Sequence, residues 1–208
     1  GYREVVLSAI SLPSYGLDTG TNLVELVEKC ARVEGIERIR LGSLDPDMLT
    51  PEYITRLAAV DKLCPQFHLS MQSGCDTVLQ RMRRKYDTAR YYESVCLLRT
   101  WFPGCAVTTD MIVAFPGETE EEFAKTLAFI EKCGFAQMHI FPYSIRPGTP
   151  AEKLHQLPKK VKEDRARQVS SVAAAMRRSY LEGCVGQVYP VLFEQPRDGK
   201  FSGHAPNY

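Results

Sequence analysis

Short apolar runs alternate with longer amphipathic stretches along most of the chain. Residues 3–10 (REVVLSAI) and 37–41 (ERIRL) are β-rich runs, whereas residues 21–33 place apolar side chains at helical spacing. Strands that alternate with helices are typical of βα units on a parallel sheet. We therefore predict an α/β fold of five consecutive right-handed βα units. The remaining strands are expected at 66–71, 105–115 and 136–141, and the remaining helices at 50–60, 76–84, 88–102 and 120–133.

Local start signals support two of these helices. Thr50 precedes Pro51 at the first position of the helix at 50–60, and this order is typical of a helix N-terminus. Thr119 and Glu122, three residues apart, predict a capping box before the helix at 120–133.

The pattern changes after residue 151. Residues 161–182 form one long, basic, amphipathic stretch that predicts a single helix, with Gly183 expected to close it. Residues 187–195, a Pro-Arg-Asp-Gly turn and the last residues then predict a β-hairpin, which is too small to be stable alone. The first residue is Gly1 rather than Met, so we expect the chain to be cut from a longer protein.

Composition narrows the class of protein without identifying a partner. The chain has 208 residues, of which 44% are hydrophobic and 25% charged, as in soluble globular proteins. It contains no apolar run of about 18 residues and no signal peptide, so we expect neither a membrane span nor secretion. The net charge is only +1, but basic residues cluster at 81–90 and 159–178. These clusters suit either a polyanion or ordinary solvated helix faces.

The seven cysteines give no metal-binding pattern. The closest pair, Cys96 and Cys105, is nine residues apart, so neither CxxC nor CxxxC spacing occurs. We predict reduced thiols, a cytoplasmic location and no metal ligands within this chain.

Polar residues follow the predicted strands at the edge where ligands bind to parallel sheets. Gln72 and Ser73 end one strand, and Gly74 allows the backbone to turn closely past a ligand. Asp110 stands inside an apolar strand, where a carboxylate is costly unless it is paired or faces a polar site. No nucleophile with an adjacent base is present, and Glu118 is explained by the helix dipole. These residues therefore predict a site that holds a ligand rather than one for acid–base catalysis, so we assign no catalytic residue. Further strand-end candidates are Ser8, Ser11, Tyr15, Ser43, Asp45, Ser70, Thr109, Tyr143, Ser144 and Arg146.

Four strand-end motifs, in order, closely resemble those of the radical S-adenosylmethionine methylthiotransferases. They are GSLDP (42–46), HLSMQSGCDTVLQRMRRKY (68–86), TTDMIVAFPGETEEEF (108–123) and FPYSIRPGTPA (141–151). The last residues resemble the start of a TRAM domain, an RNA-binding β-barrel. The resemblance implies an open, partial TIM-like barrel at 1–157, which is the radical S-adenosylmethionine core, a linker helix at 158–184 and a truncated TRAM-like domain at 185–208.

The resemblance also implies an activity. MRRKY and FPYS are most similar to the branch that places a methylthio group on C2 of N6-threonylcarbamoyladenosine, in the anticodon stem-loop of tRNA. Such enzymes use S-adenosylmethionine, a reductant and [4Fe-4S] clusters, one of which is bound by a CxxxCxxC loop that this chain lacks. We expect those ligands to lie outside the chain, and the chain alone to be inactive. The alternatives are action on isopentenyladenosine in tRNA, action on a ribosomal protein, or an RNA-binding fragment without catalysis.

Carried over by position, the resemblance implies two groups of site residues. The cofactor would contact Ser43, Asp45, Gln72, Ser73, Asp110, Phe141 and Tyr143. The substrate or its phosphates would contact Arg83, Arg84, Lys85 and Arg146. The chain departs from the family at Ser8-Ala9, where Thr-Gly is usual, at Asp45, where Glu is usual, and at Ala114, where Gly is usual.

Overall fold

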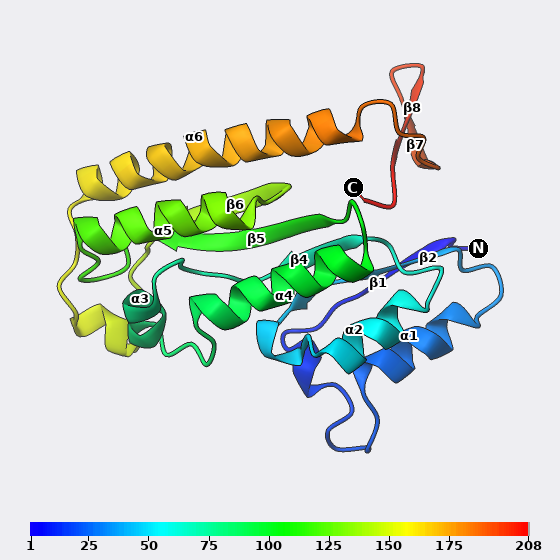
Figure 1. Cartoon of the computed structure of the whole chain (residues 1–208), viewed down its shortest axis with the longest axis horizontal. Coiled ribbons are helices and arrows are strands. Elements are labelled where there is room, and N and C mark those ends of the chain that lie inside the picture. The colour runs from blue at the N-terminus through cyan, green and yellow to red at the C-terminus, as the bar shows by residue number, and fades with distance from the viewer. Residues whose placement is uncertain (208) are drawn as a thin grey trace.

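The computed structural model describes residues 1–207 and has an α/β architecture in which strands and helices alternate (Figure 1). The elements lie close to the predicted ranges, and the strands are mostly shorter than expected at their ends. The capping box of Thr119 and Glu122 and the Thr50 cap are both present, as predicted. In chain order, the elements up to residue 142 are β1 (Glu4–Leu7), α1 (Leu23–Ala31), β2 (Arg38–Leu41), β3 (Ser43–Leu44), α2 (Pro51–Ala58), β4 (Gln66–Leu69), α3 (Asp76–Arg81), α4 (Thr88–Trp101), β5 (Ala106–Val113), α5 (Glu120–Cys133) and β6 (Gln137–Pro142).

The strands are parallel and follow one another in chain order. β1 pairs with β2, and β3 to β6 form a second sheet in the order β3-β4-β5-β6. Only Gly42 separates β2 from β3. Backbone bonds from Ile39 to Lys62 (2.8 Å) and from Cys64 to Ile39 (2.9 Å) join β2 to the residues before β4. With β2 and β3 counted as one interrupted strand, the two sheets therefore form one run of five parallel strands. This confirms the predicted βα units.

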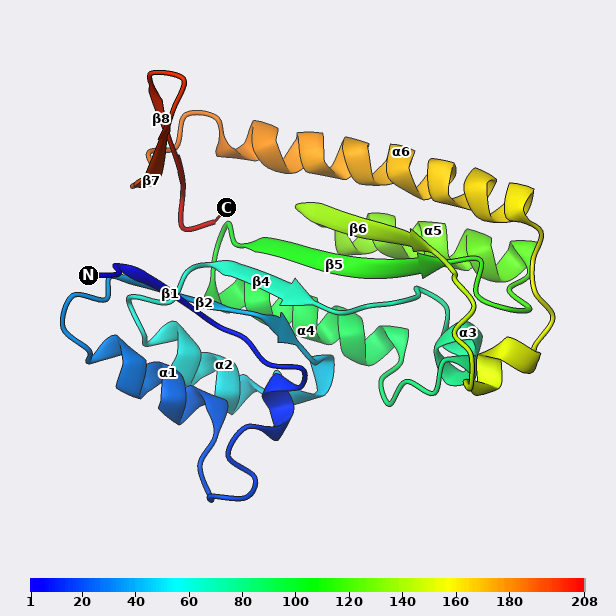
Figure 2. The ribbon, with the colours of Figure 1, turned by 180° about the vertical axis from the view of Figure 1, so that it is seen from behind.

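Side chains alternate between the two faces of this sheet. Ile39, Phe67 and Val107 are buried against the helices in the main apolar core. Their neighbours in the strands, such as Gln66 and Asp110, have the opposite orientation because successive side chains in a strand point to opposite faces. The helices thus cover one face of the sheet (Figure 2). Gln66 and Asp110 point to the other, concave face of the partial barrel.

Helix α6 (Lys159–Cys184) lies along α5 and β6 over much of the barrel's length (Figure 1). Gly183 is inside the last turn of this helix, so the prediction that it closes the helix is wrong. The helix instead ends at Cys184 with Val185 as its C-cap, and Gly186 with φ of +83° takes the turn that follows. A glycine is tolerated near a helix end because the C-terminal turn is held by few other contacts.

The predicted hairpin is present as β7 (Leu192–Arg197) and β8 (Lys200–His204), which are antiparallel. Its turn residues, Asp198 and Gly199, both have positive φ, as tight hairpin turns require. The hairpin lies at the end of the molecule that also holds the N-terminus (Figure 2). No helix within residues 1–207 combines the length and apolar character needed to cross a membrane.

The residues on both sides of the hairpin are anchored to β2. Arg38 donates to the carbonyls of Pro190 (2.6 Å) and His204 (2.7 Å). Arg40, which is nearly buried, donates to the carbonyls at 205 and 206 and forms an ion pair with Glu4 (2.7 Å). These bonds fix the hairpin segment at the amino ends of the parallel strands, opposite the edge where a ligand would bind.

Candidate functional site

Unusual backbone conformations gather at the carboxyl ends of the strands. Four non-glycine residues within 1–207 have positive φ, and one of them, Asp198, belongs to the hairpin turn. The other three are Gln72 (+67°) after β4, Arg83 (+58°) after α3 and Ala114 (+56°) after β5. Such conformations cost energy and cluster at functional sites. The left-handed conformation of Ala114 also explains why glycine is usual at this position in the family that the sequence resembles.

Two adjoining cavities open at this edge of the sheet. The first, which we call the polar cavity, has a volume of about 330 Å³ and is lined by Gln72, Asp110, Ile112, Phe141, Pro142, Tyr143, Ser144 and Arg146. The second, the arginine cavity, has a volume of about 250 Å³ and is lined by Arg81, Met82, Arg83, Arg84, Ile112, Phe115, Tyr143, Arg146, Thr149, Pro150 and Ala151. Ile112, Tyr143 and Arg146 belong to both and form the wall between them.

Four of the seven predicted cofactor residues line the polar cavity, namely Gln72, Asp110, Phe141 and Tyr143. The other three lie elsewhere. Ser73 is fully buried, and its hydroxyl accepts a bond from the Cys75 amide (3.3 Å). The carboxylate of Asp45 caps a short turn by accepting from the Asp47 amide (2.9 Å), and Ser43 is exposed outside both cavities.

The predicted substrate residues divide in the same way. Arg83 and Arg84 line the arginine cavity, and Arg146 lies in the wall between the two cavities. Lys85 is exposed and lines neither of them. Arg83 and Arg84 are therefore separated in space from Gln72 and Asp110, whereas Arg146 lies beside both groups.

Asp110 is held in place by a histidine that was not among the candidates selected from the sequence. The Oδ2 atom of Asp110 lies 3.3 Å from Nε2 of His68, whose Nδ1 lies 3.0 Å from the Thr108 hydroxyl. His68 and Thr108 are register partners on β4 and β5, so both point to the concave face with Asp110. The period-two spacing of Thr108 and Asp110, and of Gln66 and His68, is the signal that could have placed His68 here.

Thr109, another strand-end candidate, points to the opposite face. Its hydroxyl donates to the Leu69 carbonyl (2.6 Å) and accepts from the Met71 amide (3.0 Å). The fully buried Tyr91 also donates to the Leu69 carbonyl (2.7 Å). Thr109 therefore joins β4 to β5 beneath the site and does not face a ligand.

Backbone bonds fix Gln72 between neighbouring strands. Its amide donates to the Asp110 carbonyl (2.9 Å), and its carbonyl accepts from the Ile112 amide (3.0 Å). The bridge continues the parallel pairing past the end of β4 and sets the Gln72 side chain at the mouth of the polar cavity.

Tyr143 forms the aromatic part of the shared wall. Its ring packs edge-on against Phe115, with 5.3 Å between ring centroids. Lys162 of α6 donates to the Tyr143 carbonyl (2.9 Å), and its ammonium lies 5.3 Å from the centre of the ring. The Tyr143 hydroxyl is buried and has no hydrogen-bond partner within residues 1–207. A buried hydroxyl without a partner is costly, so this atom is suited to a polar group of a ligand.

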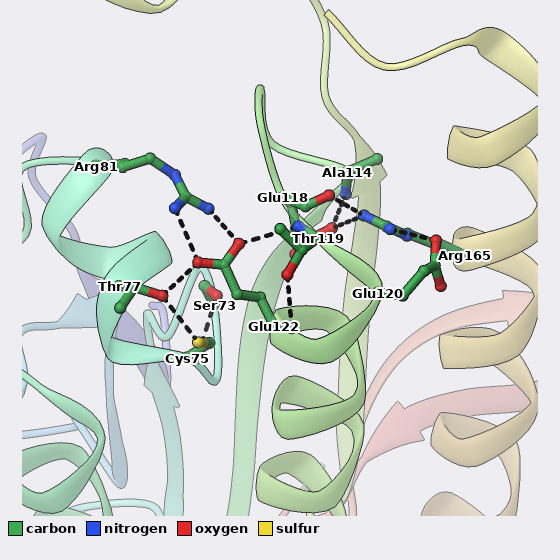
Figure 3. Close-up of polar contacts among 10 residues, drawn as sticks. All are labelled: Ser73, Cys75, Thr77, Arg81, Ala114, Glu118, Thr119, Glu120, Glu122 and Arg165. Atoms are coloured by element: carbon green, nitrogen blue, oxygen red, sulfur yellow. Dashed lines mark hydrogen bonds and ion pairs between the residues drawn. The ribbon is translucent and has the colours of Figure 1, made fainter. Parts of the chain in front are cut away.

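The turn between β5 and α5 is tied to α6 by a buried ion pair (Figure 3). Glu118 accepts bonds from the Ala114 amide (2.9 Å) and from Arg165 (2.7 Å). Arg165 also donates to the Glu118 carbonyl (3.0 Å) and to Glu120 (2.6 Å). Burial raises the pKa of the Glu118 carboxyl, and Arg165 opposes this effect. Glu118 is therefore a structural anion rather than a residue held only by the helix dipole.

On the other side of the same turn, Glu122 joins α5 to α3. Its carboxylate accepts two bonds from Arg81 (2.6 and 2.8 Å) and one from the Thr77 hydroxyl, as Figure 3 shows. The Arg81 guanidinium, followed by the Thr77 bond and the Thr119 amide, lowers the pKa of Glu122 to about 2. The positive charge of Arg81 is thus neutralised within the protein by Glu122.

The cysteines offer no site for an iron–sulfur cluster. All seven are unpaired, and residues 1–207 contain no group of three or more His, Cys, Asp or Glu side chains placed to hold a metal ion. Burial raises the pKa of Cys105 to about 11 and that of Cys133 to about 12, which disfavours the thiolate that ligates metals. The described residues therefore do not fit such a cluster.

Known enzymes resemble this chain over its whole length. It is 38% identical over 216 residues to the threonylcarbamoyladenosine tRNA methylthiotransferase MtaB of Bacillus subtilis, covering 100% of this chain and 48% of that protein. It is 37% identical over 216 residues to the tRNA-2-methylthio-N(6)-dimethylallyladenosine synthase of Acidothermus cellulolyticus, covering 100% and 44%. The chain thus spans about half the length of the curated relatives it matches.

Two solved structures share the fold. Coproporphyrinogen III oxidase (HemN) from Escherichia coli, a radical SAM enzyme, aligns with a TM-score of 0.58 and 18% identity over 74% of this chain and 36% of that one. Methylornithine synthase (PylB) aligns with a TM-score of 0.60 and 17% identity over 85% and 49%. These likenesses confirm the predicted α/β partial barrel. The profile of the Radical SAM superfamily matches residues 6–130, which is more than half of the chain, and this chain therefore belongs to the Radical SAM superfamily.

Proposed function

We propose that this chain is the cofactor- and substrate-binding barrel of an enzyme that methylthiolates N6-threonylcarbamoyladenosine in the anticodon stem-loop of tRNA. The carrying observation is the pair of adjoining cavities at the carboxyl ends of the strands, which share the Ile112–Tyr143–Arg146 wall. Two ligands bound in such cavities are held next to each other, as a reaction between a cofactor and a base requires. The names of the relatives support the tRNA substrate.

The polar cavity suits S-adenosylmethionine. Asp110 presents a carboxylate, with its side chain about one-third exposed, to the amino group of an amino acid. Gln72 offers an amide for ribose hydroxyls, and the half-exposed Phe141 ring offers a flat apolar face for adenine. The buried, unpartnered hydroxyl of Tyr143 gives a further polar contact.

When bound there, S-adenosylmethionine would supply the radical and group-transfer chemistry. The residues of this chain bind the cofactor, orient it toward the base and exclude water. They do not supply ligands for an iron–sulfur cluster, so the proposal places those ligands, and the contact with a reductant, outside residues 1–207.

The RNA-binding reading without catalysis is less well supported. It depends on basic residues of α6, and Lys159 and Lys160 are indeed exposed. Arg165, however, is buried in its ion pair with Glu118 and is not available to a phosphate. Neutralising Arg165 would therefore disturb the fold rather than report on RNA binding.

The test is product formation by the full-length enzyme with reconstituted clusters. Stem-loop RNAs carrying threonylcarbamoyladenosine or isopentenyladenosine, and ribosomal protein, are incubated separately and analysed by mass spectrometry. We expect the methylthio product on the threonylcarbamoyladenosine RNA. Product on one of the other two substrates alone would assign the enzyme to a sister branch.

The cofactor site has its own test. Asp110→Asn should weaken S-adenosylmethionine binding by about tenfold, because a charge-assisted hydrogen bond is lost. Asp61→Asn, at an exposed aspartate beside α1 and α2, is the matched control and should leave binding unchanged. Equal binding by both variants would remove Asp110 from the site.

A further inference from the structure

Three arginines around the arginine cavity have no partner among the residues that the structure describes. Arg83, Arg84 and Arg146 are exposed, and within residues 1–207 their guanidinium groups form no hydrogen bond or ion pair. Arg81 lines the same cavity, but Glu122 accepts two bonds from it. The cavity therefore carries three positive charges that the folded chain leaves uncompensated.

The acidic residues around this edge are already engaged. Glu118 pairs with Arg165, and Glu152 accepts a bond from the Gly148 amide (2.8 Å). With Glu122 bound to Arg81, none of these three carboxylates is directed at the free arginines. The positive potential is thus available to an anion from outside the chain.

The backbone holds two of these arginines at the cavity. Arg83 adopts a left-handed conformation at the end of α3, and its amide donates to the Gln80 carbonyl (2.9 Å). The Arg84 amide donates to the Leu79 carbonyl (2.9 Å). Bonds of this type close the C-terminus of a helix and fix the direction of the residues that follow. The arginines therefore belong to a formed site rather than to a free loop.

Apart from Thr149, the rest of the cavity lining is apolar. Met82, Ile112, Phe115, Tyr143 and Ala151 line it beneath the arginines. An apolar cavity with a few converging polar groups is typical of a small-molecule site. Such a site is suited to a group that has an apolar or planar body and an anionic end, since the planar guanidinium binds a carboxylate through two parallel hydrogen bonds.

We propose that the arginine cavity binds the N6 substituent of the substrate base, and that Arg83, Arg84 and Arg146 select a substituent that carries a carboxylate. This inference rests on the proposed function. The threonylcarbamoyl group has such a carboxylate, whereas the dimethylallyl group has no polar atom. An apolar substituent would displace water from the arginines without pairing their charges, and a site built to bind a polar group rejects an analogue that lacks it.

The position of Arg146 connects this selection to the reaction. Arg146 and Tyr143 lie in both cavities, so a substituent held by the arginines places its base against the wall of the polar cavity. The same residues would thus recognise the substituent and position the base beside the cofactor.

The experiment measures the affinity of the full-length enzyme for three anticodon stem-loops by fluorescence anisotropy. The loops differ only at one base, which is threonylcarbamoyladenosine, dimethylallyladenosine or unmodified adenosine. Arg84→Gln and Arg146→Gln are compared with Arg177→Gln, which alters an exposed arginine on α6 that lines neither the polar cavity nor the arginine cavity. Arg146→Lys tests whether charge alone is sufficient.

We expect the unaltered enzyme to prefer the threonylcarbamoyladenosine loop. Arg84→Gln and Arg146→Gln should each weaken binding of that loop by about tenfold to a hundredfold and change the other two loops by less than about threefold. Arg177→Gln should leave the preference intact, and Arg146→Lys should restore it only in part.

Two results would overturn the inference. If both Arg→Gln variants weaken all three loops equally, with a smaller salt dependence, the arginines bind RNA phosphates instead. If the variants keep the preference, the substituent is recognised elsewhere. Failure of the proposed function differs from both, because the unaltered enzyme would then form no methylthio product on the threonylcarbamoyladenosine loop, and the inference would fall with it.

Discussion

Removal of Arg165 should test how strongly α6 is tied to the site. The side chains of Arg165 and Glu118 are 4% and 0% exposed, and the carboxylate would keep only the Ala114 amide in Arg165→Met. Breaking a buried ion pair by removing one partner costs about 3–5 kcal/mol. For a chain of this size, each kcal/mol lowers the melting temperature by about 2–4 °C, so we expect a loss of about 6–20 °C.

The assay is urea unfolding followed by circular dichroism, at about pH 7.5 and about pH 5. Burial raises the pKa of Glu118, so the folded protein holds this proton more tightly than the unfolded chain does. Stability from this group is therefore gained as pH falls, and Arg165→Met should lose less at the lower pH. Arg167→Met, on an arginine that is 77% exposed, is the control and should change stability by less than about 0.5 kcal/mol.

A second substitution separates charge from packing. Adding Glu118→Gln to Arg165→Met should recover part of the stability, because the amide oxygen still accepts from the Ala114 amide and no charge stays buried. The reasoning is refuted if Arg165→Met costs less than about 1 kcal/mol, or if the double variant is less stable than the single one.

Three further predictions concern the same edge of the barrel and are checked by chemical unfolding. Ala114→Gly should stabilise the protein by about 0.5–1 kcal/mol, because glycine adopts the left-handed conformation without strain; a loss of stability would contradict this. Gly74→Ala should destabilise it by about 1–3 kcal/mol, because an added Cβ would lie 3.0 Å from the Phe129 side chain, and an unchanged midpoint would show that α5 can move. Arg81 holds the pKa of Glu122 at about 2, below the ordinary 4.5. The ionised Glu122 therefore contributes about 2 kcal/mol of stability above pH 4.5, and this contribution is lost as pH falls toward 2. Glu122→Gln should remove this part of the acid dependence of stability.

Local rules predicted the elements and the edge that holds the site. Alternating apolar runs predicted the parallel strands, and the Thr119–Glu122 box predicted the start of α5. The rule that ligands bind at the carboxyl ends of strands brought Gln72, Asp110 and Tyr143 together, although they lie on three different strand ends. These predictions succeeded because each depends on neighbours in the chain or on a general property of parallel sheets.

The same rule selected too many residues. Asp110 faces the polar cavity, but its neighbour Thr109 is buried on the helix side, because adjacent residues of a strand point to opposite faces. Gln72 and Ser73 differ in the same way: Gln72 lines the polar cavity, whereas the Ser73 hydroxyl accepts a bond from the Cys75 amide. The position of a residue along its strand tells whether it lies at the ligand-binding edge of the sheet. Whether its side chain faces the cavity depends on which of the two alternating faces of the strand it occupies.

Long-range pairing was beyond any local pattern. Glu118 and Arg165 are 47 residues apart, and nothing near Arg165 distinguishes it from Arg167, two residues later on the same helix. Arg165 is buried and Arg167 is exposed only because α6 presents one side to the turn that follows β5. The face of a helix that is buried is set by tertiary packing, which a charge count cannot reveal.

Helix α6 connects the two ends of the barrel. Its 26 residues span about 39 Å. Lys162 and Arg165, in its first two turns, hold the Tyr143 carbonyl and the Glu118 turn, which form walls of the two cavities. Near its other end, Tyr180 accepts a bond from Asn207 (3.0 Å), beside the segment that Arg40 anchors to the amino ends of the strands. Because both sets of contacts belong to one helix, a displacement of α6 near the hairpin would also move the cavity walls.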